Sequence, residues 1–425
     1  MKKIRIMTIL LLSLMFLAGI GFAGGQKEGA ATQAEKVQLD FWSWRTEDTK
    51  IYNDLIAMFQ KENPGISVKY SAYKTDEWNT IISAAMKGGT APDIVHLRAY
   101  GGLEQYAAPG YLVPLDDKVP ALKNFSPVAL SGVTARKDGK MYGVPFATQT
   151  LVIFYNKKIY DELGLKEPET WDDFLANLKA VKNSGRVPLA NGGKDGWMLE
   201  VMHGVICPNF YGANDFFNAL VKGETNFMDE RYRKSLEKLM ELRPYMPENF
   251  MGVAYTDTQM LFINEMAAHF IGGIWEAGYF KAQNPNLKFD VFAGPAARKG
   301  DTRYVSSFAD GSYGVYYQTK HMAEAVKYIN FTATTQFGQY FTDNLLQLSP
   351  VPGVVPKAEI LNKLLELNKH STPYVTLVGF RWEQPTGSAL LQSALQGMLS
   401  DKITSQNVVE EMQKGVATWY KPFQK

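Results

Sequence analysis

Hydrophobic and polar positions switch between the period of a strand and the period of a helix along the first hundred residues. Residues 37–42 alternate apolar and polar side chains, which predicts a half-buried strand. Ile51, Leu55 and Phe59 then repeat at helical spacing, and Asn63-Pro64-Gly65 ends that helix. The pattern next predicts a strand over 66–70, a helix over 76–86 and an apolar strand over 94–97. Strands and helices that alternate in this way indicate βαβ units on a mostly parallel sheet.

The rest of the chain predicts more strands and helices, and no internal repeat is visible. A run of β-forming residues at 151–155 predicts a strand, and the apolar run at 267–271 predicts another. Thr170 is followed by Asp172 and Asp173, which is the pattern of an N-cap with acidic residues in the first helical turn. Helices are also predicted over 232–243, 322–332, 358–368, 389–399 and 407–420. These elements together predict an α/β protein.

The first 23 residues predict a signal peptide for export. Lys2, Lys3 and Arg5 precede an apolar run at 6–17, and Gly21-Phe22-Ala23 supplies the small residues of a cleavage site. The alternative is a membrane anchor that is never removed, although the run is short for a membrane span. No lipobox Cys follows the run, and residues 24–36 predict a flexible lead. We therefore expect an exported protein, either periplasmic or associated with the cell surface.

Length and composition favour two domains and a near-neutral charge. About 400 residues follow the predicted signal, more than one hydrophobic core usually covers, and 46% of the chain is hydrophobic. Loss of the three basic signal residues changes the formal charge from +2 to −1, which argues against general binding of nucleic acids or anionic membranes. Cys207 is the only cysteine, so neither a disulfide framework nor a Cys-based metal site is expected.

A series of short motifs resembles the extracellular solute-binding proteins of the sugar class, the family that includes maltose-binding protein. Each motif is weak alone, but their order and spacing cover nearly all of the chain after the predicted signal. The C-terminal quarter matches least clearly. The motifs are FWSW (41–44), FQKENPGI (59–66), GGTAPDI (88–94), GYLVPL (110–115), DGKMYGVP (138–145), YNKK (155–158), EPETW (167–171), GGIWE (272–276) and AVKYINF (325–331).

The resemblance implies a two-lobed periplasmic-binding-protein fold of type II, in which each lobe is a mostly parallel sheet flanked by helices. The chain would cross between the lobes near 146–150, 309–314 and 349–353. The N-terminal lobe would then comprise 37–148 and 310–350, and the C-terminal lobe 149–309 and 351–425. The resemblance further implies a monomer that closes on a carbohydrate by a hinge motion and delivers it to the membrane permease of an ABC importer. No nucleic acid and no cofactor are expected.

Motifs for the common enzyme classes are missing. The five histidines are scattered, and HExxH, GxSxG and GxxxxGK[ST] do not occur, so no metal ligands and no catalytic residues are assigned. An exported glycosidase remains an alternative, because that reaction needs only two carboxylates at a suitable separation. Glu276, Asp310 and Glu383 are the candidates for such a pair. A second alternative keeps the fold and changes the ligand to a polyamine or a phosphate ester.

Binding of a sugar needs flat aromatic faces beside carboxylate, amide and guanidinium groups. The chain has 8 Trp and 22 Tyr, and several lie next to charged residues where strands are predicted to end, the place where open α/β sheets bind ligands. Trp275-Glu276 is the strongest such pair. The mixture of both charges with Trp favours a neutral or weakly acidic sugar. The predicted ligand contacts are Trp44, Arg45, Arg98, Tyr100, Gln149, Asp195, Trp197, Trp275, Glu276, Asp310, Trp382 and Glu383.

Overall fold

The computed structural model describes residues 36–424, except for the side chain of Asp76. The predicted signal peptide and nearly all of the predicted lead lie outside these residues. Within the described part, no helix has the length and apolar character needed to cross a membrane.

The first part of the described chain alternates strands and helices as predicted. β1 (Val37–Ser43) pairs in parallel with β2 (Ile66–Ala72) and with β3 (Ile94–Arg98), while α1 (Thr49–Glu62) and α2 (Thr75–Gly88) connect them. α1 buries Tyr52, Leu55, Ile56 and Phe59, which is the apolar stripe that the sequence contains at helical spacing. The shorter helices that follow are α3 (Gly101–Ala107), η1 (Pro120–Asn124) and α4 (Pro127–Ser131).

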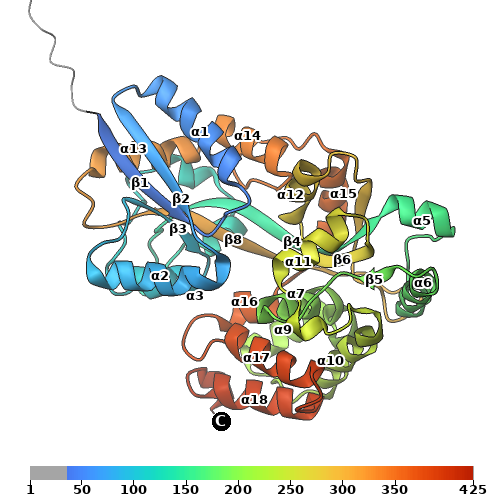
Figure 1. The fold of residues 1–425 in the computed structure, drawn as a ribbon. Helices are drawn as coiled ribbons and strands as arrows, with labels where there is room; N and C mark the ends of the chain where they lie inside the picture. The colour runs from blue at the N-terminus through green and yellow to red at the C-terminus, as the bar shows by residue number, and fades with distance from the viewer. Residues whose placement is uncertain (1–35, 425) are drawn as a thin grey trace, which may run out of the picture. The chain divides into compact units, whose positions relative to one another are not determined.

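Two long strands join this part of the sheet to the rest. β4 (Val144–Asn156) pairs with β8 (Val305–Val315) through residues 144–150, and with β6 (Ala267–Gly273) and β7 (Phe289–Phe292) through residues 151–156. β4 is therefore longer than the strand predicted over 151–155. The path of the sheet is β2-β1-β3-β8-β4-β6-β5, with β5 at Val187–Leu189 and with β9 (Ser371–Pro373) paired to β8. Figure 1 shows β4 and β8 running from the region of β1–β3 toward β6 and β5.

The two-lobed α/β fold class is confirmed, and one detail differs from the prediction. The sheet is mixed, because β4 runs antiparallel to β6, β7 and β8, and β8 runs antiparallel to β3. The strand–helix alternation of the first hundred residues correctly predicts parallel β1, β2 and β3. It contains no information on strands that pair after returning from far along the chain.

The remaining helices pack against the sheet on both sides of the middle of β4. Thr170 caps α6 in a reciprocal capping box with Asp173, as the sequence indicates. The predicted helix over 322–332 coincides with α13, and the other predicted helices are reproduced to within a few residues. The helices are α5 (Lys157–Leu163), α6 (Trp171–Asn183), α7 (Gly196–Ile206), α8 (Pro208–Tyr211), α9 (Ala213–Lys222), α10 (Glu230–Leu242), α11 (Tyr255–Ile263), α12 (Glu276–Gln283), α13 (Met322–Thr332), α14 (Thr335–Leu345), α15 (Glu359–Asn368), α16 (Val375–Phe380), α17 (Gly387–Leu399) and α18 (Ser405–Ala417), with short turns η2 (Arg243–Tyr245), η3 (Phe250–Gly252) and η4 (Lys421–Phe423).

The hydrophobic interior is divided into two large cores and smaller ones. The first core draws on residues between 39 and 147 and between 313 and 351. The second core draws on residues between 151 and 309 and between 374 and 423, together with Ala99 and Tyr100 from the loop after β3. We call the regions around these cores lobe 1 and lobe 2. The residue boundaries at which the lobes would move relative to each other stay a prediction.

Candidate functional site

A cleft with a volume of ≈ 710 Å³ is lined by residues of both lobes. Lobe 1 contributes the loop after β1, the first turn of α2 and the end of β3. Lobe 2 contributes the start of α7, the segment after β6, and helices α16 and α17. The lining residues used below are Trp44, Arg45, Glu47, Arg98, Asp195, Trp197, Glu200, Tyr255, Trp275, Phe308, Asp310, Tyr374, Arg381, Gln392 and Gln396.

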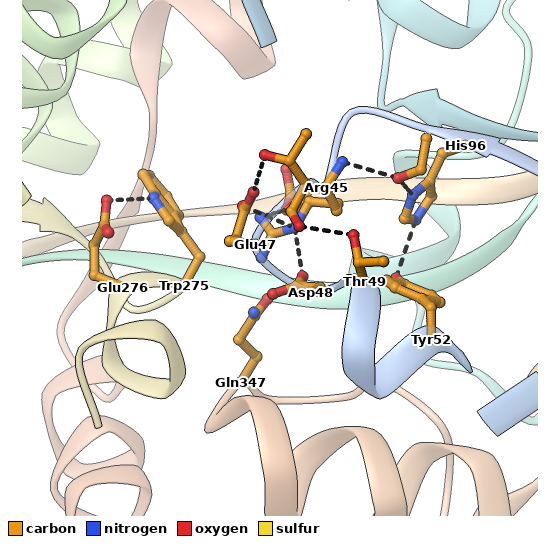
Figure 2. Close-up of polar contacts among 12 residues, drawn as sticks. Arg45, Glu47, Asp48, Thr49, Tyr52, His96, Trp275, Glu276 and Gln347 are labelled. Carbon is orange, nitrogen blue, oxygen red and sulfur yellow. Dashed lines mark hydrogen bonds and ion pairs between the residues drawn. The ribbon is translucent and has the colours of Figure 1, made fainter. Parts of the chain in front are cut away.

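Arg45 is the centre of a buried ionic cluster in lobe 1. Its Nε lies 2.7 Å from Asp48 Oδ2 and 3.4 Å from Glu47 Oε1, and its Nη1 lies 3.7 Å from Asp310 Oδ2. Figure 2 shows Arg45, Glu47 and Asp48 grouped in this way. Burial disfavours the guanidinium charge, but the three carboxylates outweigh burial and raise the pKa of Arg45 well above its usual value. Arg45 therefore stays cationic, and its Nη2 remains without a hydrogen-bond partner among the described residues.

Asp310 on β8 is held in place by Gln149 on the neighbouring strand β4. Gln149 on β4 donates a 2.9 Å hydrogen bond to Asp310 Oδ2 and a 2.8 Å hydrogen bond to Gln347 Oε1. Gln149 is fully buried, whereas Asp310 is 7% exposed and lines the cleft. Gln149 thus positions Asp310 from behind.

Trp275 and Glu276 lie together at the end of β6, with different exposures. Trp275 is half-buried and lines the cleft, while Glu276 is 1% exposed and does not. Glu276 accepts hydrogen bonds from Trp275 Nε1 (2.9 Å), from the Tyr255 hydroxyl (2.7 Å) and from Gln259 Nε2 (2.8 Å). Figure 2 shows the Trp275 indole turned toward this carboxylate. Burial raises the pKa of Glu276 to about 7, against the effect of these donors.

Trp44 lines the cleft but is almost fully buried. Its exposed fraction is 3%, and its ring packs against His96, Trp78 and Phe146. The Arg98 guanidinium carbon lies 4.2 Å from the centre of the Trp44 ring, within cation–π distance. The aromatic ring therefore supports Arg98.

The first turn of α7 brings two more predicted residues to the cleft. Asp195 Oδ2 accepts a 2.7 Å hydrogen bond from the backbone N–H of Tyr255, and Trp197 packs edge-to-face on the Tyr255 ring with centroids 4.7 Å apart. One turn later, Glu200 is buried and accepts hydrogen bonds from Thr376 and Gln392. The sequence prediction missed Glu200, although a single carboxylate in the apolar stretch of α7 is a usable signal.

Seven of the twelve predicted residues meet in the cleft, and five lie outside its lining. Gln149 and Glu276 are buried behind Asp310 and Trp275. Tyr100 accepts a hydrogen bond from the Ala309 N–H, and its ring meets Trp382 edge-to-face with centroids 6.0 Å apart. Trp382 is also covered by Arg136, and Glu383 is exposed. The seven lining residues are Trp44, Arg45, Arg98, Asp195, Trp197, Trp275 and Asp310.

Tyr374 and Arg381 line the cleft and were not among the predicted contacts. Arg381 adjoins the predicted Trp382 and Glu383, which do not line the cleft. Tyr374 comes from a short connection between β9 and α16 with no sequence pattern of its own. Its proximity to the cleft follows from the parallel pairing of β9 with β8.

The carboxylate pair that the glycosidase alternative requires is not assembled from its three candidates. Asp310 lines the cleft, Glu276 is buried with three hydrogen-bond donors, and Glu383 is exposed outside the lining. The side chains that the structure describes also include no group of three His, Cys, Asp or Glu placed to hold a metal ion. What the cleft presents is a half-buried indole, guanidinium groups and carboxylates that are already hydrogen-bonded.

Comparison with known proteins gives consistent similarities. The family model described as bacterial extracellular solute-binding protein matches residues 42–338. The multiple sugar-binding protein of Streptococcus mutans serotype c is 26% identical over 351 residues, which is 80% of this chain and 81% of that protein. A chitin oligosaccharide binding protein of known structure has a TM-score of 0.78 at 23% identity, covering 91% of this chain and all of that one. The solute-binding protein RafE in complex with raffinose has a TM-score of 0.77 at 22% identity, covering 92% and 100%.

Proposed function

The chain belongs to the bacterial extracellular solute-binding protein family, and from that premise we propose that it captures a carbohydrate, specifically an oligosaccharide, in the cleft between its lobes. The observation that carries the proposal is Trp275, a half-buried indole fixed by Glu276 and directed at a cleft that is otherwise lined by hydrogen-bonding groups. A volume of ≈ 710 Å³ is within the range of small-molecule sites.

Aromatic and polar groups have separate parts in this proposal. The face of Trp275 stacks on the C–H face of a sugar ring. Asp310, Asp195 and Gln396 accept from or donate to hydroxyl groups. The second layer, formed by Gln149 and Glu276, holds these groups in place so that little conformational entropy is lost on binding. Names of similar proteins that bind sugars support this choice of ligand.

The proposed mechanism is capture by hinge closure. β4 and β8 are the natural hinge, because β4 pairs with β8 in lobe 1 and with β6 and β7 in lobe 2. Closure around a ligand between two lobes is a known class of motion. The closed protein then presents the sugar to the permease of an ABC importer, and export by the predicted signal peptide brings it to the required compartment.

A melting-temperature screen against mono- and oligosaccharides tests the proposal. A ligand at 100 times its Kd stabilises the folded state by about 2.7 kcal/mol, and we expect such a shift with at least one sugar. A shift with a polyamine and none with any sugar would contradict the choice of ligand. Sustained release of reducing ends from an oligosaccharide would favour the glycosidase alternative.

A further inference from the structure

Two arginines of the cleft, one from each lobe, have no anionic partner. Arg98 ends β3 in lobe 1, and Arg381 follows α16 in lobe 2. Among the side chains that the structure describes, neither guanidinium donates a hydrogen bond or forms an ion pair, and the Nε of Arg98 is buried without an acceptor. Both residues are half-buried, and guanidinium groups that are withdrawn from water are normally paired and hydrogen-bonded.

The carboxylates of the cleft are engaged elsewhere. Asp310 accepts from Gln149 and lies 3.7 Å from Arg45, Glu200 accepts from Thr376 and Gln392, and Asp195 accepts from a backbone N–H. Glu47 also lies within ion-pair distance of Arg45. These carboxylates therefore have hydrogen-bond or ion-pair partners in the protein, whereas Arg98 and Arg381 have neither among the described side chains.

The backbone is closely packed at these two arginines. Arg98 lies over the Trp44 ring, and a side chain at Gly102 would place its Cβ 2.5 Å from the Cβ of Arg98. A Cβ at Gly101 would lie only 1.8 Å from the carbonyl oxygen of Arg381. Glycine at 101 thus permits the backbone of lobe 2 to approach the start of α3. The pair is built into the contact between the lobes.

The electrostatics of the site agree with this geometry. Burial, together with the nearby charge of Arg381, lowers the pKa of Arg98 to about 9, and burial lowers the pKa of Arg381. Tyr374 lines the same cleft and is 2% exposed, and its buried hydroxyl has no hydrogen-bond partner among the described residues. Asp310 acts in the opposite direction on the pKa of both arginines, as do Glu47 on Arg98 and Glu200 on Arg381, so the site combines unused guanidinium donors with nearby carboxylates.

We propose that Arg98, Arg381 and the Tyr374 hydroxyl form a subsite for one anionic substituent of the bound carbohydrate, such as the carboxylate of a uronic acid unit. The proposal rests on the proposed function and adds the chemical class of the ligand. Guanidinium groups bind carboxylate and sulfate oxygens in bidentate fashion, through charge-assisted hydrogen bonds. Because the two arginines come from different lobes, the anion also removes a repulsion that opposes closure.

Isothermal titration of the purified protein with matched probes tests this subsite. The probes are galacturonic acid di- and trisaccharides, the corresponding neutral galactose oligosaccharides, a sulfated disaccharide and glucose 6-phosphate. We expect an acidic saccharide to bind at least tenfold more tightly than its neutral counterpart, with an affinity that falls as salt increases. The three acidic probes distinguish a carboxylate from a sulfate or a phosphate as the anion.

Variants assign the preference to the two arginines. Arg98→Gln and Arg381→Gln are each expected to raise the Kd for the acidic ligand by roughly 10- to 100-fold and the Kd for the neutral one by less than threefold. Arg298→Gln is the matched control, because Arg298 pairs with Asp301 on an exposed loop and does not line the cleft. Arg98→Lys keeps the charge without the bidentate geometry and should weaken binding by an intermediate factor.

Each result decides for or against the subsite. Equal loss of acidic and neutral ligands in both glutamine variants would overturn it, as would tighter binding of the neutral oligosaccharides by the unmodified protein. Both of those results leave carbohydrate capture intact. Absence of binding by every saccharide would contradict the proposed function as well. The unliganded melting temperature of each variant shows that it is folded.

Discussion

The indole Nε1 of Trp275 donates a 2.9 Å hydrogen bond to the carboxylate of its neighbour Glu276. The carboxylate is 1% exposed and also accepts from Tyr255 and Gln259, so it fixes the orientation of the ring and has no surface in the cleft. Two adjacent residues with one predicted role therefore have two different positions: Trp275 lines the cleft and Glu276 supports it.

Trp275→Ala should weaken carbohydrate binding by about tenfold or more, since a half-buried aromatic ring in a binding site contributes well over 1 kcal/mol. Trp275→Phe keeps a flat ring and should lose less. Trp42→Ala is the control, because Trp42 packs on Tyr73 and is not part of the cleft lining. Titration calorimetry measures the three affinities, and an unchanged Kd in Trp275→Ala would refute the stacking role.

Glu276 should make stability depend on pH. Its pKa is raised to about 7 in the folded protein and is about 4.5 in the unfolded chain, so between these values the folded state binds more protons. The free energy of unfolding from this group is therefore highest below pH 4.5 and is lost as pH rises toward 7, by about 3 kcal/mol in total. Glu276→Gln should not show this loss.

Urea unfolding of wild type and Glu276→Gln from pH 5 to pH 8 gives the comparison. The variant keeps an acceptor for Trp275 and Tyr255, and the Gln259 amide can turn to accept from the new amide. The free energy of unfolding of Glu276→Gln relative to that of the wild type should increase as pH rises. A constant gap across this range would show that Glu276 does not titrate there.

Asp310→Ala should reduce both stability and binding. The substitution removes an acceptor from buried Gln149 and one of the carboxylates around Arg45, at a cost of about 1–3 kcal/mol in unfolding free energy. Asp301→Ala on the exposed loop is the control and should change stability by less than about 0.5 kcal/mol. Urea unfolding and sugar titration measure the effects, and equal effects in the two variants would be inconsistent with the described network.

Arg136→Ala tests the contact between the lobes. The Arg136 guanidinium carbon lies 3.4 Å from the centre of the Trp382 ring, and this contact forms where lobe 2 meets lobe 1. Its loss should raise the Kd for the sugar by about 2- to 5-fold, through faster dissociation. Arg231→Ala is the control, because it removes contacts with Phe216 and Asp229, which both lie in lobe 2. Stopped-flow dissociation rates that do not differ between the two would exclude a role in closure.

Cys207 offers an independent measure of ligand binding. The residue is fully buried, its thiol donates to the Ser235 carbonyl oxygen, and burial raises the pKa of the thiol. A thiol reagent should therefore react only after unfolding. A sugar at 100 times its Kd should slow labelling about 100-fold when opening and closing are fast relative to the reaction. Labelling at the same rate with and without sugar would contradict ligand-linked stability.

Much of the fold could be predicted because the necessary information is local. The apolar stripe of α1, the Thr170–Asp173 capping box and the alternation in β1 each depend on neighbours within four residues. The antiparallel pairings of β4 and β8 could not be predicted in this way. They join residues more than 150 positions apart, and no local period specifies such a partner.

The chain by itself determined that lobes of alternating strands and helices would form, that no common catalytic motif is present, and that aromatic residues lie beside charges where strands end. Only the tertiary structure decided which side chain of each pair faces the cleft, since exposure depends on how distant segments pack. It buried Glu276 behind Trp275, covered Trp44 with Arg98, and brought Arg381 rather than Glu383 to the lining. The charge balance of the site is thus a property of packing: the carboxylates accept hydrogen bonds or form ion pairs within the protein, whereas Arg98 and Arg381 form neither among the described side chains.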